Sequence, residues 1–256
     1  MSAAPAAMLL LIDAGNTRIK WALADAGAAP GAWLASGARP HAMPELLTAD
    51  WQAALAGRAV SQVLLSNVAG PALGQVLQTL LAALPAPDVV CFASLPQLAG
   101  LRNGYRDPYQ LGCDRFAAAI GGRWLVPDQP IVIATCGTAT TIDAVSADGC
   151  FVGGMILPGL GLMAGALARN TAQLPHITPA AQLPHGFADN TADAILSGCL
   201  AAQAGAIERA CAAHGATSCL LSGGAAPAVA TALSQPYRMV DNIVLLGLHV
   251  AATSPS

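Results

Sequence analysis

Two segments, one in each half of this 256-residue chain, share a pattern that strongly restricts the possible fold. "LLIDAGNTRIK" (residues 10–20) and "IVIATCGTATTID" (residues 131–143) each begin with a continuous apolar run. In both, a glycine followed by Asn or Thr then interrupts the run, and a second strand-like stretch returns. Such a pattern predicts a buried strand, a tight turn and a return strand. We therefore predict an internal repeat at domain scale, with Asp13 and Thr135 at matching positions.

Strand-like and helix-like segments alternate through the rest of the chain, which indicates an α/β fold. We expect two halves, residues 1–122 and 123–256. Apolar spacing and turn residues predict helices at 44–57, 71–84, 114–125, 161–172 and 191–213. They predict strands at 8–12, 18–24, 63–68, 88–92, 131–135, 136–145, 150–157 and 218–224.

The composition is apolar and poor in charge. Hydrophobic residues make up 55% of the chain and charged residues 10%, which fits either a buried subunit interface or a bias in base composition. The net charge is −3 and no basic tract occurs, so we expect no binding to nucleic acid.

Cysteine usage and the start of the chain point to the cytoplasm. The seven cysteines are odd in number and contain no Cys-x-x-Cys pair, which is typical of a reducing compartment. The start "MSAAPAAMLLLID" has no basic segment, and Asp13 ends its apolar run, so we expect no signal peptide. No apolar stretch is long enough to predict a membrane span.

The first of the two segments contains the only lysine of the chain, Lys20, just after the turn; the other ten basic residues are arginines. A glycine between two strands lets backbone N–H groups approach an anion, and the side chains of Asn16 and Thr17 could join them. Asp13 at the strand end could hold Mg²⁺ through water, and Lys20 supplies a mobile positive charge. The alternative is an ordinary hairpin turn, since Gly and Asn favour those as well.

The second turn, "TCGTATTID", again surrounds a glycine with hydroxyls, although threonine is also simply common in strands. Two such hairpins suit a nucleotide, but no Walker loop occurs. The junction "LSGG" fits either a third contact to the nucleotide or the plain end of a strand. "GGMILPGLGLM" fits either a close-packed strand-to-helix turn or a wall of the substrate site.

The segment "GYRDPYQLGCDR" (residues 104–115) is the most enzyme-like part of the chain. Asp114 and Arg115 fall at the predicted N-terminus of a helix, where exposed N–H groups favour negative charge. Asp114 should be ionised at pH 7 and could accept a hydroxyl proton, and Arg115 could hold a carboxylate. The alternative is a structural acid at a helix N-terminus.

Taken together, these segments resemble a known family. "DAGNTRIK", "YRDPYQLGCDR", "CGTATTID", "GGMILPG", "ADNTADAILSG" and "LSGG" occur in the order and spacing found in type III pantothenate kinases. That family belongs to the superfamily of acetate and sugar kinases, heat-shock chaperones and actin, and some members are labelled Bvg accessory factor. The resemblance implies two ribonuclease H-like (actin-like) domains with ATP in the cleft between them. It implies phosphorylation of pantothenate to 4′-phosphopantothenate, the first step of coenzyme A biosynthesis.

The resemblance also implies roles for individual residues. Asp13 would position, through water, the Mg²⁺ that accompanies ATP. The residues implied at the ATP site are Asp13, Ala14, Gly15, Asn16, Thr17, Arg18, Ile19, Lys20 and Thr138. Those implied at the pantothenate site are Tyr105, Gly112, Cys113, Asp114, Arg115 and Thr191. Asp114 would be the proton acceptor, and Thr191 would reach the pocket from the other subunit of a homodimer.

One position departs from the family pattern. Where the family usually carries an aspartate that binds K⁺ or NH₄⁺, this chain has Thr135, and a neutral hydroxyl attracts a cation far less than a carboxylate does. The monovalent cation is therefore in doubt. Two alternatives to the pantothenate kinase remain: a kinase of the same superfamily with another small hydroxyl acceptor, and a non-catalytic accessory factor of transcription that retains the fold.

Overall fold

The computed structural model describes residues 7–84, 88–175, 177, 183–184, 186–217 and 219–254. Residues 1–6, at the start where we expected no signal peptide, lie outside this part. The chain forms two compact units, residues up to 125 together with 243 onward, and residues 126–242. This division differs from the expected one at residue 122/123, because the last helix of the chain belongs to the first unit. Among the described residues, no helix combines the length and apolar composition that crossing a bilayer requires.

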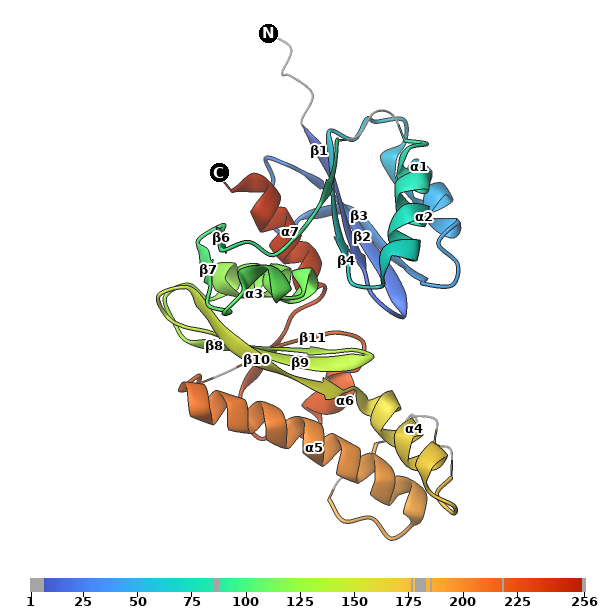
Figure 1. Ribbon diagram of the computed structural model, residues 1–256, viewed down its shortest axis with the longest axis vertical. Coiled ribbons are helices and arrows are strands. Elements are labelled where there is room, and N and C mark those ends of the chain that lie inside the picture. Colours follow the sequence, from blue (N-terminus) through green and yellow to red (C-terminus); the bar gives the residue numbers. More distant parts are fainter. Residues whose placement is uncertain are drawn as a thin grey trace. The chain divides into compact units, whose positions relative to one another are not determined.

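The first unit is built on a five-stranded sheet in the order β3-β2-β1-β4-β5 (Figure 1). β1 pairs antiparallel with β2 and parallel with β4. The strands are β1 (Met8–Ala14), β2 (Arg18–Asp25), β3 (Trp33–Pro40), β4 (Gln62–Asn67) and β5 (Asp88–Cys91), followed by a small hairpin of β6 (Gln97–Leu98) and β7 (Leu101–Asn103). The helices are α1 (Leu46–Leu55), α2 (Pro71–Leu81), the 3₁₀ turn η1 (Pro108–Gln110), α3 (Cys113–Leu125) and α7 (Ile243–Thr253).

Alternation along the strands places two kinds of side chain on the two faces of this sheet. Leu10, Ile12 and Ala14 of β1 pack into a core with α1 and α2. The intervening residues of β1, which include Asp13, therefore face the opposite side, on which α7 contacts β1 and α3 contacts β4 (Figure 1). The alternation of side chains along β1 thus directs Asp13 toward the N-terminal region of α3.

The second unit repeats the same strand order. Its neighbouring strands run β10-β9-β8-β11-β12, which matches β3-β2-β1-β4-β5 one for one. The elements are β8 (Ile131–Cys136), β9 (Ala139–Val145), β10 (Cys150–Pro158), α4 (Leu160–Asn170), α5 (Thr191–His214), β11 (Cys219–Ser222), α6 (Ala226–Ala230) and β12 (Tyr237–Met239). Asp13 pairs with Ser66 of β4, and Thr135 pairs with Ser222 of β11, so Asp13 and Thr135 occupy equivalent positions of the two sheets. The predicted repeat is confirmed at this level.

Helices α3 and α7 lie against each other through glycine (Figure 1). A Cβ atom built on Gly247 would overlap the carbonyl oxygen of Ala117, and one on Gly121 would lie 2.8 Å from the carbonyl oxygen of Ile243. The two backbones are therefore in direct contact. This close approach holds the last helix of the chain on the helix that carries Asp114.

We expect Gly247→Ala to destabilise the protein by about 1–3 kcal/mol, because the added methyl group meets backbone that can yield only by separating the two helices. Gly205→Ala in α5 is the matched control, since nothing lies within 4 Å of the Cβ that it adds. That control should be neutral or stabilising by up to about 1 kcal/mol, the helix-propensity gain. Thermal unfolding of both variants measures the difference; equal unfolding temperatures would contradict the close packing of α3 and α7.

Candidate active site

Three polar side chains meet on one face of the first sheet. Asp13 of β1 lies directly opposite Lys20 of β2 and Ser66 of β4 in the strand register. Ile19 and Trp21, which flank Lys20, pack on the opposite face with α1 and α2. The side chains of Asp13, Lys20 and Ser66 therefore share the face that α3 covers.

The β1–β2 turn closes through a hydrogen bond of 3.1 Å from the N–H of Gly15 to the carbonyl of Arg18. The side chains of Asn16, Thr17 and Arg18 are exposed. Ala14 and Ile19 are fully buried with the core of the sheet, so their side chains are unavailable to a ligand. Of the segment that we expected to bind ATP, the turn residues and Lys20 present side chains to a ligand, and Ala14 and Ile19 can offer only backbone.

His41 braces this turn from the end of β3. Its backbone N–H donates to the carbonyl of Thr17 at 2.9 Å, and its Nδ1 lies 3.3 Å from the carbonyl oxygen of Gly15. Because a carbonyl can only accept, Nδ1 carries the proton in this contact. The sequence analysis missed His41, since a lone histidine 24 residues after the turn shows no local sign of such a contact.

Burial disfavours the ionised form of Asp13. Only 8% of the residue is exposed, and burial raises its pKa to about 6. Lys20 lowers the pKa and the negative charge of Asp114 raises it, with burial outweighing the lysine. An ionised Asp13 would therefore be stabilised by an additional cation at this point.

Asp114 lies in the first turn of α3, as predicted. Its Oδ1 accepts a hydrogen bond of 2.8 Å from the backbone N–H of Arg115. Burial raises its pKa, against the opposing effects of that N–H and of the guanidinium of Arg115. The pKa is thus higher than the ordinary value that suffices for a late proton acceptor, and the carboxyl is a correspondingly better base.

Arg115, which is buried, and Tyr105, which is half-buried, form a pair next to this acid. Arg115 is 7% exposed, and its Nη1 donates to the hydroxyl of Tyr105 at 2.9 Å, with the guanidinium carbon 5.8 Å from the ring centroid. Gly112 precedes them, and a Cβ there would lie 2.8 Å from Oδ1 of Asp114. The absence of a side chain at residue 112 leaves room for the carboxylate of Asp114.

Cys113 ties the start of α3 to the end of β4. Its Sγ lies 3.4 Å from Oγ of Ser66 and 3.7 Å from the carbonyl oxygen of Asn67. Burial raises the pKa of the Cys113 thiol, so this cysteine is a packing and hydrogen-bonding residue and not an activated nucleophile. Ser66, which pairs with Asp13 and contacts Cys113, thus links the two acids. The strand "VLLSNV" was predicted, but the position of Ser66 depends on strand register and was missed.

In the second unit, the β8–β9 turn is held by two close backbone approaches. The N–H of Gly159 donates to the carbonyl of Thr138 at 2.8 Å, and a Cβ on Gly159 would collide with the carbonyl oxygens of Gly137 and Thr138. Gly223, at φ +97°, lies against the backbone of Cys136. The segments "GGMILPGLGLM" and "LSGG", which contain Gly159 and Gly223, therefore pack closely around this turn. Gly137 and Thr138 of the turn itself are exposed.

Thr135 lies among neutral hydroxyls. Thr141 is its partner on β9 and Ser222 its partner on β11, where the first sheet has Lys20 and Ser66 beside Asp13. Val132, Ala134 and Cys136 pack against α5 and α6, so Thr135 points to the other face. The pattern of the first sheet is repeated here without its charges.

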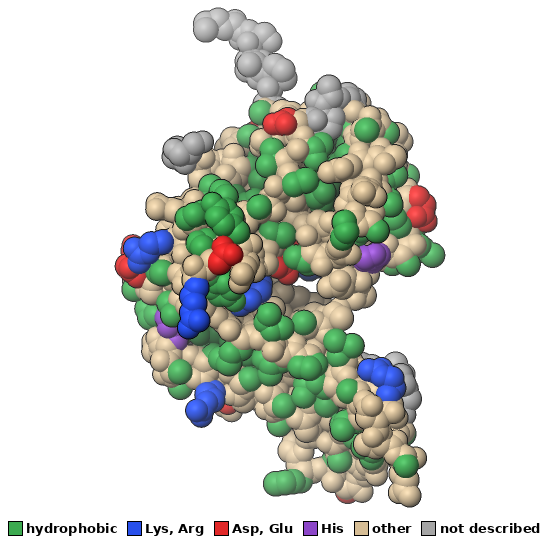
Figure 2. Space-filling view, viewed as in Figure 1, with side chains coloured by type: hydrophobic (Ala, Val, Ile, Leu, Met, Phe, Trp, Pro, Cys, Tyr) green, Lys and Arg blue, Asp and Glu red, His purple; other side chains and the backbone are tan. Residues whose placement is uncertain are grey.

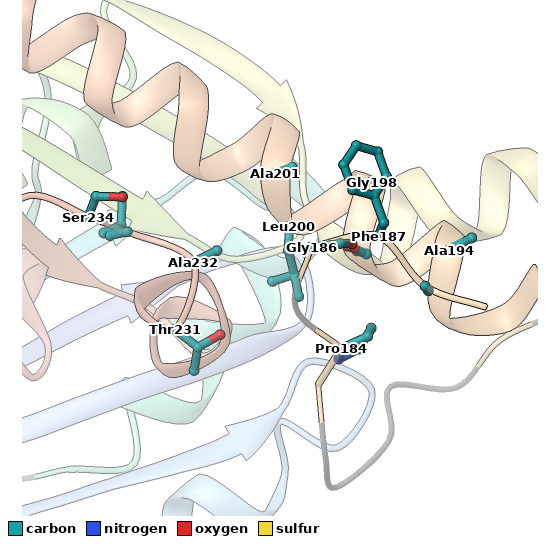
Figure 3. A pocket seen from close by; sticks show the side chains of 13 residues that line it. Pro184, Gly186, Phe187, Ala194, Gly198, Leu200, Ala201, Thr231, Ala232 and Ser234 are labelled. Atoms are coloured by element: carbon teal, nitrogen blue, oxygen red, sulfur yellow. The ribbon is translucent and has the colours of Figure 1, made fainter. Parts of the chain in front are cut away.

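Thr191 is the first residue of α5 and is exposed. Near it, Pro184, residues 186–188, α5 and the chain after α6 line a cavity of about 620 Å³ in the second unit (Figure 3). Among the described residues, its lining contains no charged side chain and none of the predicted site residues. It is therefore unsuited to hold phosphates.

Charge elsewhere is sparse. On the face shown in Figure 2, the basic side chains of the described residues are few and scattered among acidic and apolar ones. Within the described part of the chain, no group of three or more His, Cys, Asp or Glu side chains could hold a metal ion. A Mg²⁺ ion that arrives with ATP needs only one or two protein carboxylates, and Asp13 could supply one.

Comparison with known proteins identifies the family. Residues 9–213 match the family model of type III pantothenate kinases. A type III pantothenate kinase of Herminiimonas arsenicoxydans is 55% identical over 255 residues, which cover 96% of this chain and 97% of that protein.

Solved structures with low sequence identity share the fold. A protein described as a Baf family transcriptional activator from Campylobacter jejuni has a TM-score of 0.59 and 19% identity, covering 93% of this chain and 94% of its own. The activator of 2-hydroxyisocaproyl-CoA dehydratase from Clostridium difficile, with bound ADPNP, has a TM-score of 0.54 and 13% identity, covering 97% and 93%. The predicted two-domain, actin-like α/β fold is confirmed. The family match, spanning most of the chain, and the near-full-length relative show that this chain belongs to the type III pantothenate kinases.

Proposed function

We propose that this protein transfers the γ-phosphoryl group of ATP to the 4′-hydroxyl of pantothenate, forming 4′-phosphopantothenate and ADP, the first step of coenzyme A biosynthesis. The observation that carries the proposal is the arrangement in the first unit. There, a half-buried base, Asp114, lies within electrostatic reach of Asp13, which faces Lys20, and next to the Arg115–Tyr105 pair. Phosphoryl transfer requires positioning and charge neutralisation more than covalent chemistry, and these residues supply both.

At the nucleotide, Lys20 and the turn Gly15–Arg18, which is exposed from Asn16 to Arg18, bind phosphate oxygens. Asp13 would hold the Mg²⁺ that accompanies ATP, since a cation favours ionisation of a buried carboxylate whose pKa burial has raised to about 6. When bound, the ion neutralises phosphate charge. Lys20, the only lysine of the chain, lies half-buried and opposite Asp13 in the strand register, where it can reach those oxygens.

At the acceptor, Asp114 takes the proton of the pantothenate hydroxyl as the new P–O bond forms. Arg115 holds the carboxylate of pantothenate, with Tyr105 lining the pocket and Gly112 and Cys113 shaping its floor. The pKa of Asp114, raised by burial, increases its affinity for that proton.

A panel of acceptors tests this assignment. Purified protein with Mg²⁺ and ATP is given pantothenate, small sugars or short hydroxy acids, with K⁺ or NH₄⁺ present, and ADP release is followed. We expect release only with pantothenate and close analogues. Release with a sugar and not with pantothenate would favour another kinase of the superfamily, and no release with any acceptor would favour an accessory factor without catalysis.

We further propose that the enzyme acts in the cytoplasm as a homodimer, with Thr191 completing the partner's pantothenate pocket. Exposed apolar side chains of the second unit support an interface there: Val152 and Ile156 on β10, and Phe187 just before α5. Light scattering at assay concentration should give twice the chain mass, and Thr191→Ala should raise the KM for pantothenate. A fully active monomer would contradict the shared pocket.

The monovalent cation gives a second test. Because Thr135, Thr141 and Ser222 offer only neutral oxygens, we expect activation to require high K⁺ or NH₄⁺. Thr135→Asp restores a carboxylate at the position equivalent to Asp13, and this variant should saturate at a lower cation concentration. Activity is titrated in sodium-free buffer for both proteins. Saturation of the parent at low-millimolar K⁺, unchanged by the substitution, would show that residue 135 is not the cation site.

A further inference from the structure

Asn103 stands at the start of the loop that carries Tyr105. The residue ends β7 and is 7% exposed. Its backbone N–H donates to the carbonyl of Pro96 at 2.8 Å, which fixes it to the chain before β6. It is neither a family-matched site residue nor part of the phosphoryl-transfer machinery described above.

The side-chain amide of Asn103 closes the loop from both ends. Its Oδ1 accepts the backbone N–H of Tyr105 at 3.1 Å, and its Nδ2 donates to the carbonyl of Pro108 at 2.9 Å. One amide therefore satisfies a donor at the start of the loop and an acceptor at its end. Only Asn or a residue of similar shape offers both a hydrogen-bond acceptor and a donor at this distance from the backbone, because one bond needs an acceptor and the other a donor.

The loop closed in this way is short and otherwise exposed. Asp107 organises its middle, since Oδ1 of Asp107 accepts the N–H of Tyr109 at 3.1 Å. Arg106, Asp107, Tyr109 and Gln110 are all exposed, so little packing holds the loop in place. The buried amide of Asn103 accordingly attaches both ends of this loop, and buried hydrogen bonds of this kind fix conformation strongly.

We infer that Asn103 is a positioning residue for the acceptor site: by holding the backbone of Tyr105, it places the hydroxyl that orients Arg115. The line of contact runs from Asn103 Oδ1 to the N–H of Tyr105, and from the Tyr105 hydroxyl to Nη1 of Arg115 at 2.9 Å. The inference rests on the proposed function in taking pantothenate as the ligand of Arg115. It adds a residue that never touches the substrate but sets its affinity.

Steady-state kinetics with both substrates test this role. Asn103→Ala should raise the KM for pantothenate roughly 10-fold, because small displacements of a positioning group are costly, while the KM for ATP stays within about twofold. Gln110→Ala, an exposed change in the same loop, is the matched control and should leave both constants unchanged. Asn103→Ser, which keeps a polar group at the buried position, is measured in parallel in case the alanine variant folds poorly.

A double-mutant cycle separates positioning from general loosening. Tyr105→Phe keeps the ring and removes the hydroxyl that holds Arg115. If Asn103 acts through that hydroxyl, Asn103→Ala in the Tyr105→Phe background should raise the KM for pantothenate by much less than it does alone. The inference would be overturned if the increase in the KM for pantothenate in the double variant equalled the product of the two single increases. Equal increases in the KM values for ATP and pantothenate would overturn it as well.

Hydrogen exchange makes the test independent of catalysis. The Tyr105 amide should exchange faster in Asn103→Ala than in the parent, with little change at the amides of β1 and β4. Unchanged exchange at Tyr105 would also overturn the inference. If the parent exchanges as expected but does not phosphorylate pantothenate, it is the proposed function that fails, and the hold of Asn103 on Tyr105 remains.

Discussion

Asp114→Asn should reduce kcat by about 10²–10⁴-fold and leave the KM for ATP close to that of the parent. The amide keeps the shape of the carboxyl, and its oxygen can still accept the N–H of Arg115 that Oδ1 of Asp114 accepts at 2.8 Å. It cannot take up the hydroxyl proton of pantothenate. The loss should therefore appear in the chemical step and not in nucleotide binding or folding.

The matched control for this variant is Asp107→Asn, an exposed acid seven residues earlier. Asp107 caps η1 through the N–H of Tyr109, a role that asparagine also fills. Single-turnover and steady-state rates are measured for both variants. Turnover of Asp114→Asn within twofold of the parent would remove Asp114 from the role of base.

Asp13→Asn should abolish most of the activity and, at the same time, make the ligand-free protein more stable near pH 8. Burial raises the pKa of Asp13 to about 6 from 3.8, so the folded state favours the protonated acid. Stability is therefore lost as pH rises from about 4 through 6, and above that range the ionised carboxylate costs roughly 3 kcal/mol. Asparagine removes this cost together with the charge that holds Mg²⁺.

The sign of the effect is checked by its pH dependence. The unfolding temperature of Asp13→Asn should exceed that of the parent by several degrees at pH 8, and the difference should vanish near pH 4, where Asp13 is protonated. Asp50→Asn is the control with the opposite sign. Arg39 donates to Asp50 from Nε at 2.6 Å and from Nη2 at 2.5 Å and lowers its pKa, so that variant should be less stable than the parent at pH 8. An unfolding temperature of Asp13→Asn below that of the parent at pH 8 would show that burial does not destabilise the ionised carboxylate of Asp13.

Local patterns predicted the parts of the fold whose signals are local. The buried runs that became β1 and β8 end in glycine turns, and Pro71 begins α2 as predicted. β3 was missed because "WLASGARP" contains no β-branched residue and its Gly37 lies against the ring of Trp21, which only the folded sheet reveals. The place of α7 was also missed, because its contact with α3 depends on glycines 126 residues apart, Gly121 and Gly247.

The candidate site divides in the same way. Asp13, Lys20, Asp114 and Arg115 stand out in the sequence as charges beside turns or at a helix start. His41, Ser66 and Asn103 do not, since each acts through a partner that strand register or loop closure brings near. The sequence predicts no shift in the pKa of Asp114, yet this pKa is raised, because burial at the start of α3 outweighs the neighbouring N–H and guanidinium groups. Burial is a property of the folded chain that spacing alone does not reveal.

The most direct measurement is identification of the product by mass spectrometry and phosphorus NMR after incubation with Mg²⁺, ATP and pantothenate in the presence of NH₄⁺. The account predicts 4′-phosphopantothenate in amounts equal to the ADP released, and almost none with Asp114→Asn. ADP without phosphorylated pantothenate, no reaction of the folded parent, or equal product from Asp114→Asn would contradict it.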